Sequence, residues 1–263
     1  MRADKYFAEK FGSRTKSAEA IEKGLVLVNG KKIKPKDDIS ETDEIVFVQA
    51  EESFVSNGGY KLSRAIKAFG YHCKDKIFAD IGASTGGFTD CLLQNGAKKV
   101  FAVDVGESLL HERLKDDARI VQMENCNARY LKKEDFSEPL DAVVADVSFI
   151  SLRLIFPVIK ELLSENGDGF ILIKPQFECE NKHIGKSGIV HSDAHAKIIE
   201  KVVGYAEDSG LYAFGIINAP VRKGKNIEYI LWVKPQKSYA LTKGQIVDKV
   251  KGLIKNHTLG ILK

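Results

Sequence analysis

Helical spacing marks the first 24 residues. Between positions 3 and 11, apolar residues recur every three or four positions, which predicts a short helix that Gly12 ends. A second helix is expected to have Ser17 as its N-terminal cap and to end at Gly24. The chain is therefore expected to start with two short helices.

Strand-like runs follow these helices. Residues 25–28 are apolar, and the dipeptide Asn29-Gly30 after them is a strong signal for a tight hairpin turn. Residues 31–34 would form the second strand of the hairpin, and residues 45–48 would close a small sheet. The pattern thus predicts an α+β unit over residues 1–50, followed by a linker over residues 51–57.

From residue 58 to residue 235, short apolar runs alternate with helical stretches. This alternation predicts an α/β domain with a Rossmann-like, doubly wound sheet of seven strands, whose ligands bind at the carboxyl ends of the strands. Helices are expected over residues 88–95, 151–163 and 193–208, and Pro157 indicates a kink or a late start in the second of them. The expected strands are Ile77 to Ile81, Val100 to Asp104, Ile120 to Met123, Ala142 to Val147, Gly169 to Ile173, Tyr212 to Ile217 and Ile227 to Val233.

The composition is that of an ordinary globular protein. The chain has 263 residues, of which 44% are hydrophobic and 29% charged, and these values exclude disordered, collagen-like and disulfide-scaffold classes. We see no signal or membrane-spanning segment, so we expect a cytoplasmic protein with no membrane partner. The 4 cysteines are scattered without a C-x-x-C motif, which favours reduced thiols, and no metal site is expected.

Charge is strongly polarised along the chain, although the net value is only +4. Residues 1–36 carry 10 basic and 4 acidic side chains, whereas residues 37–52 carry 7 acidic side chains and no basic ones. A phosphate backbone would meet such a basic face first, but a solvated charged surface explains it equally well. The tail, residues 236–263, has 6 basic and 1 acidic side chains and apolar residues at helical spacing. It is predicted to be a basic amphipathic helix that either extends a nucleic-acid surface or packs on the preceding domain.

The segment from Asp80 to Asp90 carries the clearest ligand-binding signal. Its glycines let the backbone turn tightly between a strand and a helix. Their spacing, G-x-x-x-G-G, is that of neither a dinucleotide site nor a P-loop, which disfavours an NAD-dependent oxidoreductase. The acidic start suits a ligand with a positive charge, such as S-adenosylmethionine, and Asp104 at the end of the next strand can accept both hydroxyls of a ribose.

Four charged residues stand where an apolar pattern would not place them. Lys61 lies in an amphipathic helix, Asp146 and Lys174 end two predicted strands, and Glu228 interrupts the run from Ile227 to Val233. Charged groups at strand ends or inside a buried strand are costly unless they are paired. We therefore expect the four side chains to neutralise one another at one place in the fold.

The N-terminal pattern resembles the αL RNA-binding domain found in a small-subunit ribosomal protein, in pseudouridine synthases and in a tyrosyl-tRNA synthetase. The resemblance rests on Arg2-Ala3-Asp4, Ser13-Arg14, Val28-Asn29-Gly30 and Asp43-Glu44-Ile45. It implies contacts to phosphates that follow the shape of an RNA rather than its bases. A protein-binding module that kept the fold is the alternative. The cations expected to contact RNA are Arg2, Arg14, Lys16, Lys31, Lys32, Arg64 and Lys186.

Along essentially its full length, the chain resembles the TlyA family. That family joins an αL domain to a methyltransferase domain similar to FtsJ, and the match implies 2′-O-methylation of a cytidine ribose in ribosomal RNA with S-adenosylmethionine as the cofactor. The short N-terminus favours the members that act on the large subunit alone over those that act on both subunits. The motifs that carry the resemblance are Ser56 to Leu62, Asp80 to Asp90, Asn127 to Leu131, Asp146 to Leu152, Lys174 to Glu178, Gly185 to Val190 and Asn226 to Glu228.

The resemblance also assigns the site. Lys61, Asp146, Lys174 and Glu228 are the expected catalytic tetrad. Lys174 is the candidate for the proton of the ribose hydroxyl, either as a neutral base or as a cation that orients the oxygen. The residues expected to bind the cofactor are Asp80, Gly82, Ala83, Ser84, Thr85, Gly86, Gly87, Phe88, Asp104, Asn127 and Asp146.

Two positions depart from the family pattern. Asn57 stands where an arginine is usual, which puts one RNA contact in doubt, and Glu107-Ser108 replaces a common Tyr-Gly beside the cofactor pocket. Neither departure touches the tetrad.

The expected partners are ribosomal RNA and ribosomal subunits, and the oligomeric state stays open. A non-enzymatic RNA-binding or ribosome-assembly factor is the first alternative. A membrane-lytic haemolysin is the second, which the lack of a visible apolar span disfavours.

Overall fold

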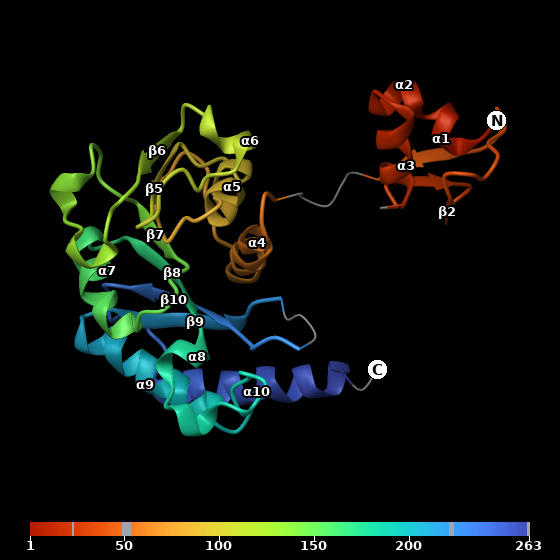
Figure 1. The fold of residues 1–263 in the computed structure, drawn as a ribbon. Helices are drawn as coiled ribbons and strands as arrows, with labels where there is room; N and C mark the ends of the chain where they lie inside the picture. The colour runs from red at the N-terminus through yellow and green to blue at the C-terminus, as the bar shows by residue number, and fades with distance from the viewer. Residues whose placement is uncertain (23, 49–53, 221–223, 262–263) are drawn as a thin grey trace. The chain divides into compact units, whose positions relative to one another are not determined.

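The computed structural model describes residues 1–22, 24–48, 54–220 and 224–261, with side chains as far as residue 255. The chain divides into two compact units, Met1–Ser53 and Phe54–Lys263 (Figure 1). The first three positions of the expected linker at residues 51–57 lie outside the described residues.

The first unit is a small α+β fold. Its sheet is antiparallel, with the strand order β2-β1-β3. The helices are α1 (Ala3–Tyr6), α2 (Ala8–Phe11) and α3 (Arg14–Glu22), and the strands are β1 (Val26–Val28), β2 (Lys31–Lys32) and β3 (Ile45–Phe47). The core between them consists of Ala3, Phe7, Ile21, Val26, Val28 and Ile39.

The predicted N-terminal cap at Ser17 is wrong. Helix α3 already begins at Arg14. The side chain of Ser13 accepts a hydrogen bond from Lys16 N at 3.2 Å, so it satisfies a free N–H group of the first turn. Ser17 is buried inside the helix, because it lies on the face that packs against the core.

The predicted helix end at Gly12 and the predicted turn at Asn29-Gly30 are confirmed. Gly12 ends α2 in the left-handed conformation, with φ of 81°, although the expected single helix is divided in two at Phe7. Asn29 and Gly30 have φ values of 51° and 74°, as the tight turn between β1 and β2 requires.

The second unit is built on a seven-stranded sheet of order β6-β5-β4-β7-β8-β10-β9. The neighbours of β10 are antiparallel to it, and the other pairs are parallel. All seven predicted strands are present, within two residues of the expected ends. The strands are β4 (Ile77–Ile81), β5 (Lys99–Val103), β6 (Ile120–Met123), β7 (Ala142–Ala145), β8 (Asp168–Ile173), β9 (Tyr212–Asn218) and β10 (Tyr229–Lys234).

Helices cover both faces of this sheet. Apolar residues of α4 (Asn57–Phe69) and α5 (Gly87–Gln94) pack on one face. Those of α7 (Phe156–Leu162), α9 (His195–Asp208) and α10 (Lys243–Ile261) pack on the other. The short helices are α6 (Glu112–Lys115), α8 (Pro175–Glu178), η1 (Ala128–Tyr130), η2 (Lys133–Asp135), η3 (Leu152–Leu154) and η4 (Asn181–His183).

The roles of Pro157 and of the C-terminal tail, each left open by the sequence, are decided by the structure. Pro157 lies in the first turn of α7, where a missing N–H costs nothing, so it marks a late start and not a kink. In the tail, Ile246 and Val250 of α10 are fully buried in the larger core. The tail therefore packs on the domain. Among the described helices, none is both long and apolar enough to cross a bilayer.

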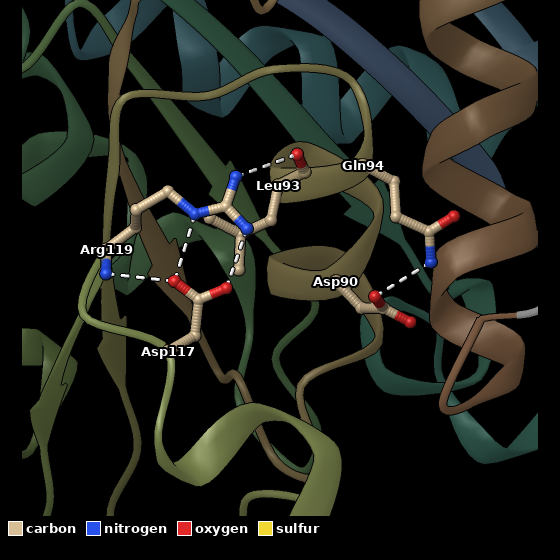
Figure 2. Close-up of polar contacts among 5 residues, drawn as sticks. All are labelled: Asp90, Leu93, Gln94, Asp117 and Arg119. Atoms are coloured by element: carbon tan, nitrogen blue, oxygen red, sulfur yellow. Dashed lines mark hydrogen bonds and ion pairs between the residues drawn. The ribbon is translucent and has the colours of Figure 1, made fainter.

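Polar contacts bind the loops beside α5 to that helix (Figure 2). Arg119, just before β6, forms an ion pair with Asp117 at 2.6 Å and donates to a carbonyl in the last turn of α5 at 3.3 Å. At the other end of the helix, Asp90 accepts a hydrogen bond from Val55 N at 2.7 Å. The start of the second unit is thereby held against α5.

Candidate functional site

The glycine-rich loop between β4 and α5 takes a shape that side chains would prevent. Gly82 has φ of +81°, and a Cβ there would lie 2.8 Å from the carbonyl oxygen of Asp146. Gly86 has φ of +87°, and a Cβ there would collide with Leu114. A Cβ on Gly87 would collide with the hydroxyl of Ser56. The glycines therefore allow the loop to approach both the end of β7 and the start of α4 closely.

Asp80 lies beneath this loop and is fully buried. One carboxylate oxygen accepts hydrogen bonds from the N–H and the hydroxyl of Thr89, at 2.9 and 2.7 Å, so Asp80 fixes the first turn of α5. Burial raises the pKa of Asp80 to about 7, with the charges of Asp146 and Asp104 adding to the rise and the bonds from Thr89 opposing it. The structure thus places Asp80 as a support of the loop and not in the wall of the cavity described next.

A cavity of about 170 Å³ opens above the glycine-rich loop. Its wall contains six of the expected cofactor residues of the loop, together with Asp146 and Lys174 of the expected tetrad. The lining residues are Ser56, Gly58, Gly82, Ala83, Ser84, Thr85, Gly87, Phe88, Asp146, Ser148 and Lys174. One space is therefore bounded by both the loop and two residues of the tetrad.

A smaller hollow adjoins the same loop and is lined by Asp104, with Ala83 and Ser84 shared between the two spaces. The two carboxylate oxygens of Asp104 accept hydrogen bonds from Ser84 N at 2.8 Å and Gly106 N at 2.9 Å. Each oxygen keeps a further acceptor position. Asn127 caps η1 through Arg129 N and lines neither space.

The four expected catalytic side chains lie together as a chain of alternating charges. Lys61 Nζ lies 2.7 Å from Glu228 Oε2 and 3.7 Å from Asp146 Oδ2. Lys174 Nζ lies 2.6 Å from the other oxygen of Asp146. The four side chains are only 11% to 20% exposed, so the pairing that compensates their desolvation is required.

The topology of the sheet explains this gathering. Asp146 follows β7 and Lys174 follows β8, so both stand at carboxyl ends of neighbouring parallel strands. Glu228 was expected to interrupt a strand, but it lies one residue before β10. Because β10 is antiparallel to β8 and pairs Tyr229 with Ile173, its first residues reach the same edge. Lys61 comes from α4, whose first turn borders the loop. Gly58 and Gly59 belong to that first turn.

Ser148 and Phe149, which follow Asp146, belong to the surroundings of the site, although neither was singled out in the sequence. Ser148 accepts a hydrogen bond from Lys174 Nζ at 2.7 Å and lines the cavity. Phe149 is 90% exposed with φ of 61°, and its ring lies 5.0 Å from that of Phe177. The only sequence signal for either residue was membership of the motif that follows Asp146.

Two of the expected RNA-binding arginines share a buried partner in the first unit. Asp4 is 5% exposed and accepts from Arg2 at 2.9 Å and from Arg14 at 3.1 Å. Burial pushes the pKa of Asp4 upward, but the two guanidinium groups outweigh it and hold this pKa below its ordinary value. The side chains of both arginines remain more than half exposed, so Asp4 orients them at the surface.

The other expected RNA-binding cations lie at the surface of their units. Lys16, Lys31 and Lys32 are exposed in the first unit. In the second unit, Arg64 is exposed one helical turn beyond Lys61 and donates to Asn218 at 3.2 Å. Lys186 is exposed in the turn between the bridged residues Ile184 and Val190. This turn is bound to the segment before Glu228, because Asn226 donates to Gly188 O and accepts from Val190 N.

No group of three or more potential metal ligands occurs within residues 1–22, 24–48, 54–220 and 224–255. The described site consists of the glycine-rich loop, Asp104, Ser148 and the four charged side chains of the tetrad.

A mixed seven-stranded sheet with one reversed strand near its edge, and a glycine-rich loop after a central strand, define a methyltransferase fold. The family model of FtsJ-like methyltransferases matches residues 54–235, and that of the S4 domain matches residues 1–45. The S4 domain is the small RNA-binding unit expected at the N-terminus. The chain belongs to the TlyA family of FtsJ-like methyltransferases.

Relatives of similar length carry the family assignment. The 16S/23S rRNA (cytidine-2'-O)-methyltransferase TlyA of Mycobacterium tuberculosis is 37% identical over 90% of this chain and 90% of its own. The 23S rRNA (cytidine-2'-O)-methyltransferase TlyA of Campylobacter jejuni is 35% identical over 73% of this chain and 82% of its own. A solved structure from Streptococcus thermophilus, named as a hemolysin, is 36% identical and covers 98% of both chains with a TM-score of 0.71.

Proposed function

We propose that the protein transfers a methyl group from S-adenosylmethionine to the ribose 2′-hydroxyl of a cytidine in large-subunit ribosomal RNA. The observation that carries this proposal is the cavity whose wall holds both the glycine-rich loop and the Asp146–Lys174 pair. The choice of substrate is supported by the names of the two TlyA relatives, which share 23S rRNA and cytidine.

The residues around the cavity fit the proposed cofactor. S-adenosylmethionine supplies a methyl group that is already activated on a positively charged sulfur. Asp104 retains acceptor positions suited to ribose hydroxyls, and the carboxylate of Asp146 in the wall offers oxygens that suit a sulfonium or ammonium group. The glycine-rich loop brings backbone rather than side chains to the same wall.

Lys174 is the residue that would act on the substrate hydroxyl. A ribose hydroxyl is a weak nucleophile at neutral pH and has to be aligned and deprotonated as the new bond forms. The nitrogen of Lys174 forms an ion pair with Asp146 and donates a hydrogen bond to Ser148. These contacts would hold the amine in place, so that it orients the 2′-oxygen and takes its proton. Lys61 and Glu228 keep Asp146 in place through its other oxygen.

The first unit would supply affinity for RNA. Its exposed cations and the pair of arginines around Asp4 suit contacts to phosphates, which fix the position of a protein on RNA without reading bases. Because such contacts carry little sequence information, the choice of nucleotide would come from the catalytic unit and the shape of the RNA.

The proposal is tested with purified protein, labelled S-adenosylmethionine, and separate small and large ribosomal subunits that lack the modification. We expect label to enter the large subunit at one cytidine, at a position that resists alkaline cleavage because its 2′-oxygen is methylated. Label confined to a base, or absent from both subunits while RNA binding persists, would contradict the proposal. The latter result would favour a non-enzymatic RNA-binding factor.

A further inference from the structure

We infer that Glu178 is a positioning residue for methyl transfer, because its carboxylate joins the loop that carries Asp146 to the helix that follows Lys174. The inference rests on the proposed function. It concerns a buried acidic side chain that has no direct role in the chemistry described above.

Glu178 is the last residue of α8 and is 5% exposed. One carboxylate oxygen accepts a hydrogen bond from the hydroxyl of Ser151 at 2.8 Å, and the other accepts one from Leu152 N at 2.7 Å. Leu152 is the first residue of η3, so Glu178 reaches across from one segment to cap the start of another. Burial raises the pKa of Glu178, while the bonds from Leu152 and Ser151 oppose the rise.

Two segments are thus joined at both of their ends. One segment, residues 146–152, follows β7, and the other, residues 174–178, follows β8. At one end, Lys174 forms an ion pair with Asp146 and donates a hydrogen bond to Ser148. At the other end, Glu178 bonds to Ser151 and Leu152, and between the two ends the rings of Phe149 and Phe177 are in contact. The contacts form a closed ring, and Lys174 is one of its members.

A third element anchors this ring. Lys201 of α9 donates a hydrogen bond to the main-chain carbonyl of Glu178, and α9 is packed into the larger core through Ile199 and Val202. The contact places α8 on a rigid support. Movement of Ser151 relative to α8 would therefore displace Ser148 and Asp146 from Lys174, and not α8 from the domain.

The chemistry depends on such a fixed distance. Misplacement of reacting groups by about 1 Å can cost on the order of a hundredfold in rate. Glu178 stands four residues from Lys174 and Ser151 stands five from Asp146, so a loosened link would act on the two catalytic groups from both sides. A buried carboxylate is also a costly way to fill space, since an apolar side chain would need no partners.

Two variants of Glu178 separate hydrogen bonding from charge. In Glu178→Gln, the amide oxygen can accept from Leu152 N, and the amide nitrogen can donate to Ser151, whose hydroxyl is both donor and acceptor. The link is kept without its charge. In Glu178→Ala, both bonds are lost and Leu152 N is left without its acceptor.

Asp168 offers a matched control at the opposite edge of the sheet. It is also a buried carboxylate, and its Oδ1 lies 2.7 Å from Trp232 Nε1 and 3.3 Å from Lys234 Nζ. Because Asp168 begins β8 whereas Lys174 follows its end, Asp168→Ala removes comparable contacts far from the reacting groups. It reports what loss of stability alone does to the rate.

The experiment measures kcat on large-subunit RNA, the Kd for S-adenosylmethionine and the thermal unfolding midpoint of each variant. The rate and binding assays are run at a temperature below the unfolding range of all variants. We expect kcat to fall about tenfold or more in Glu178→Ala, with cofactor affinity kept, and to stay within about threefold of wild type in Glu178→Gln and in Asp168→Ala.

Equal kcat in Glu178→Ala and wild type would overturn the inference, as would equal losses in Glu178→Ala and Asp168→Ala. A loss in Glu178→Gln as large as in Glu178→Ala would show that the charge and not the link matters, and it would overturn the inference too. Wild-type protein without any methyl transfer would instead refute the proposed function, and the inference with it.

Discussion

The two units use their charges in opposite ways. In the catalytic unit, Lys61 and Lys174 are at most 20% exposed and each lies within 2.7 Å of a carboxylate. In the N-terminal unit, Arg2 and Arg14 are more than half exposed and share one buried acid, Asp4. Few charges held in fixed positions suit an alignment of reacting atoms. Many exposed charges suit attraction of a polyanion, which tolerates imprecise geometry.

The difference predicts that single changes are severe in the catalytic unit and graded in the N-terminal unit. The largest effect is expected for Asp146→Asn. The asparagine amide carries no negative charge to place between Lys61 and Lys174, and only one of its two terminal atoms can accept a hydrogen bond. We expect kcat to fall roughly a thousandfold, measured as labelled methyl transfer to large-subunit RNA. RNA affinity should be unchanged. A loss of less than tenfold would show that the tetrad does not need its central charge.

A smaller effect is expected at Ser148, which holds Lys174 by one hydrogen bond. We expect Ser148→Ala to lower kcat about tenfold, in keeping with about 1.4 kcal/mol for such a bond. Ser148→Thr should restore much of the rate because the hydroxyl returns. The KM for RNA should stay constant in both variants. An equally slow threonine variant would mean that the size of the side chain, and not its hydroxyl, is what matters.

The N-terminal unit is tested by reversal of exposed charge. Lys16→Glu with Lys31→Glu is expected to weaken RNA binding about tenfold and to reduce the slope of log K against log salt by about 1.4 or more, in a filter-binding titration. The control is Lys197→Glu with Lys249→Glu, which changes the net charge equally on exposed positions of α9 and α10. Equal losses in the two double variants would mean that total charge, and not its placement, governs binding. The affinity for S-adenosylmethionine should not change in either.

An effect on stability, and not on rate, is expected at Asp80, whose pKa in the folded protein is about 7. The unfolded chain ionises this group near pH 4, so the folded state binds more protons between these two values. The stability contributed by the group is full below about pH 4 and is lost as the pH rises through 7. In Asp80→Asn, the amide oxygen can keep both bonds from Thr89 and nothing titrates.

The measurement is urea unfolding of wild type and Asp80→Asn at pH 4 and pH 8. The free energy of unfolding of wild type relative to the variant is expected to fall by on the order of 4 kcal/mol between these pH values. A difference that does not change with pH would show that Asp80 is ionised in the folded protein throughout.

Sequence patterns predicted those parts of the site that depend on neighbours along the chain. The glycine-rich loop follows a strand and precedes a helix within ten residues, and Asp104, Asp146 and Lys174 each directly follow a parallel strand. Because parallel strands end at a common edge, their spatial proximity could be inferred without coordinates. Confirmed strand positions show that the alternation of apolar runs contains this information.

Other parts depend on which elements meet in space. Glu228 was expected inside a strand but lies just before β10. It reaches the site because β10 is antiparallel to β8, and apolar periodicity does not show the direction of a strand. Ser13 rather than Ser17, the only cap predicted, satisfies the first turn of α3. Ser148 and Glu178 gain their roles only because the loops after β7 and β8 lie against each other. Periodicity carries no signal for a contact of that kind.

The most direct test of the account is methyl transfer by Lys174→Ala, with labelled S-adenosylmethionine and large ribosomal subunits that lack the modification, alongside calorimetric binding of the cofactor. We predict that transfer falls to background while the cofactor Kd stays within about threefold of wild type, because Lys174 acts on the hydroxyl and the glycine-rich loop binds the cofactor. Transfer at the wild-type rate by a folded variant would contradict the central claim that the tetrad around Asp146 is the catalytic site.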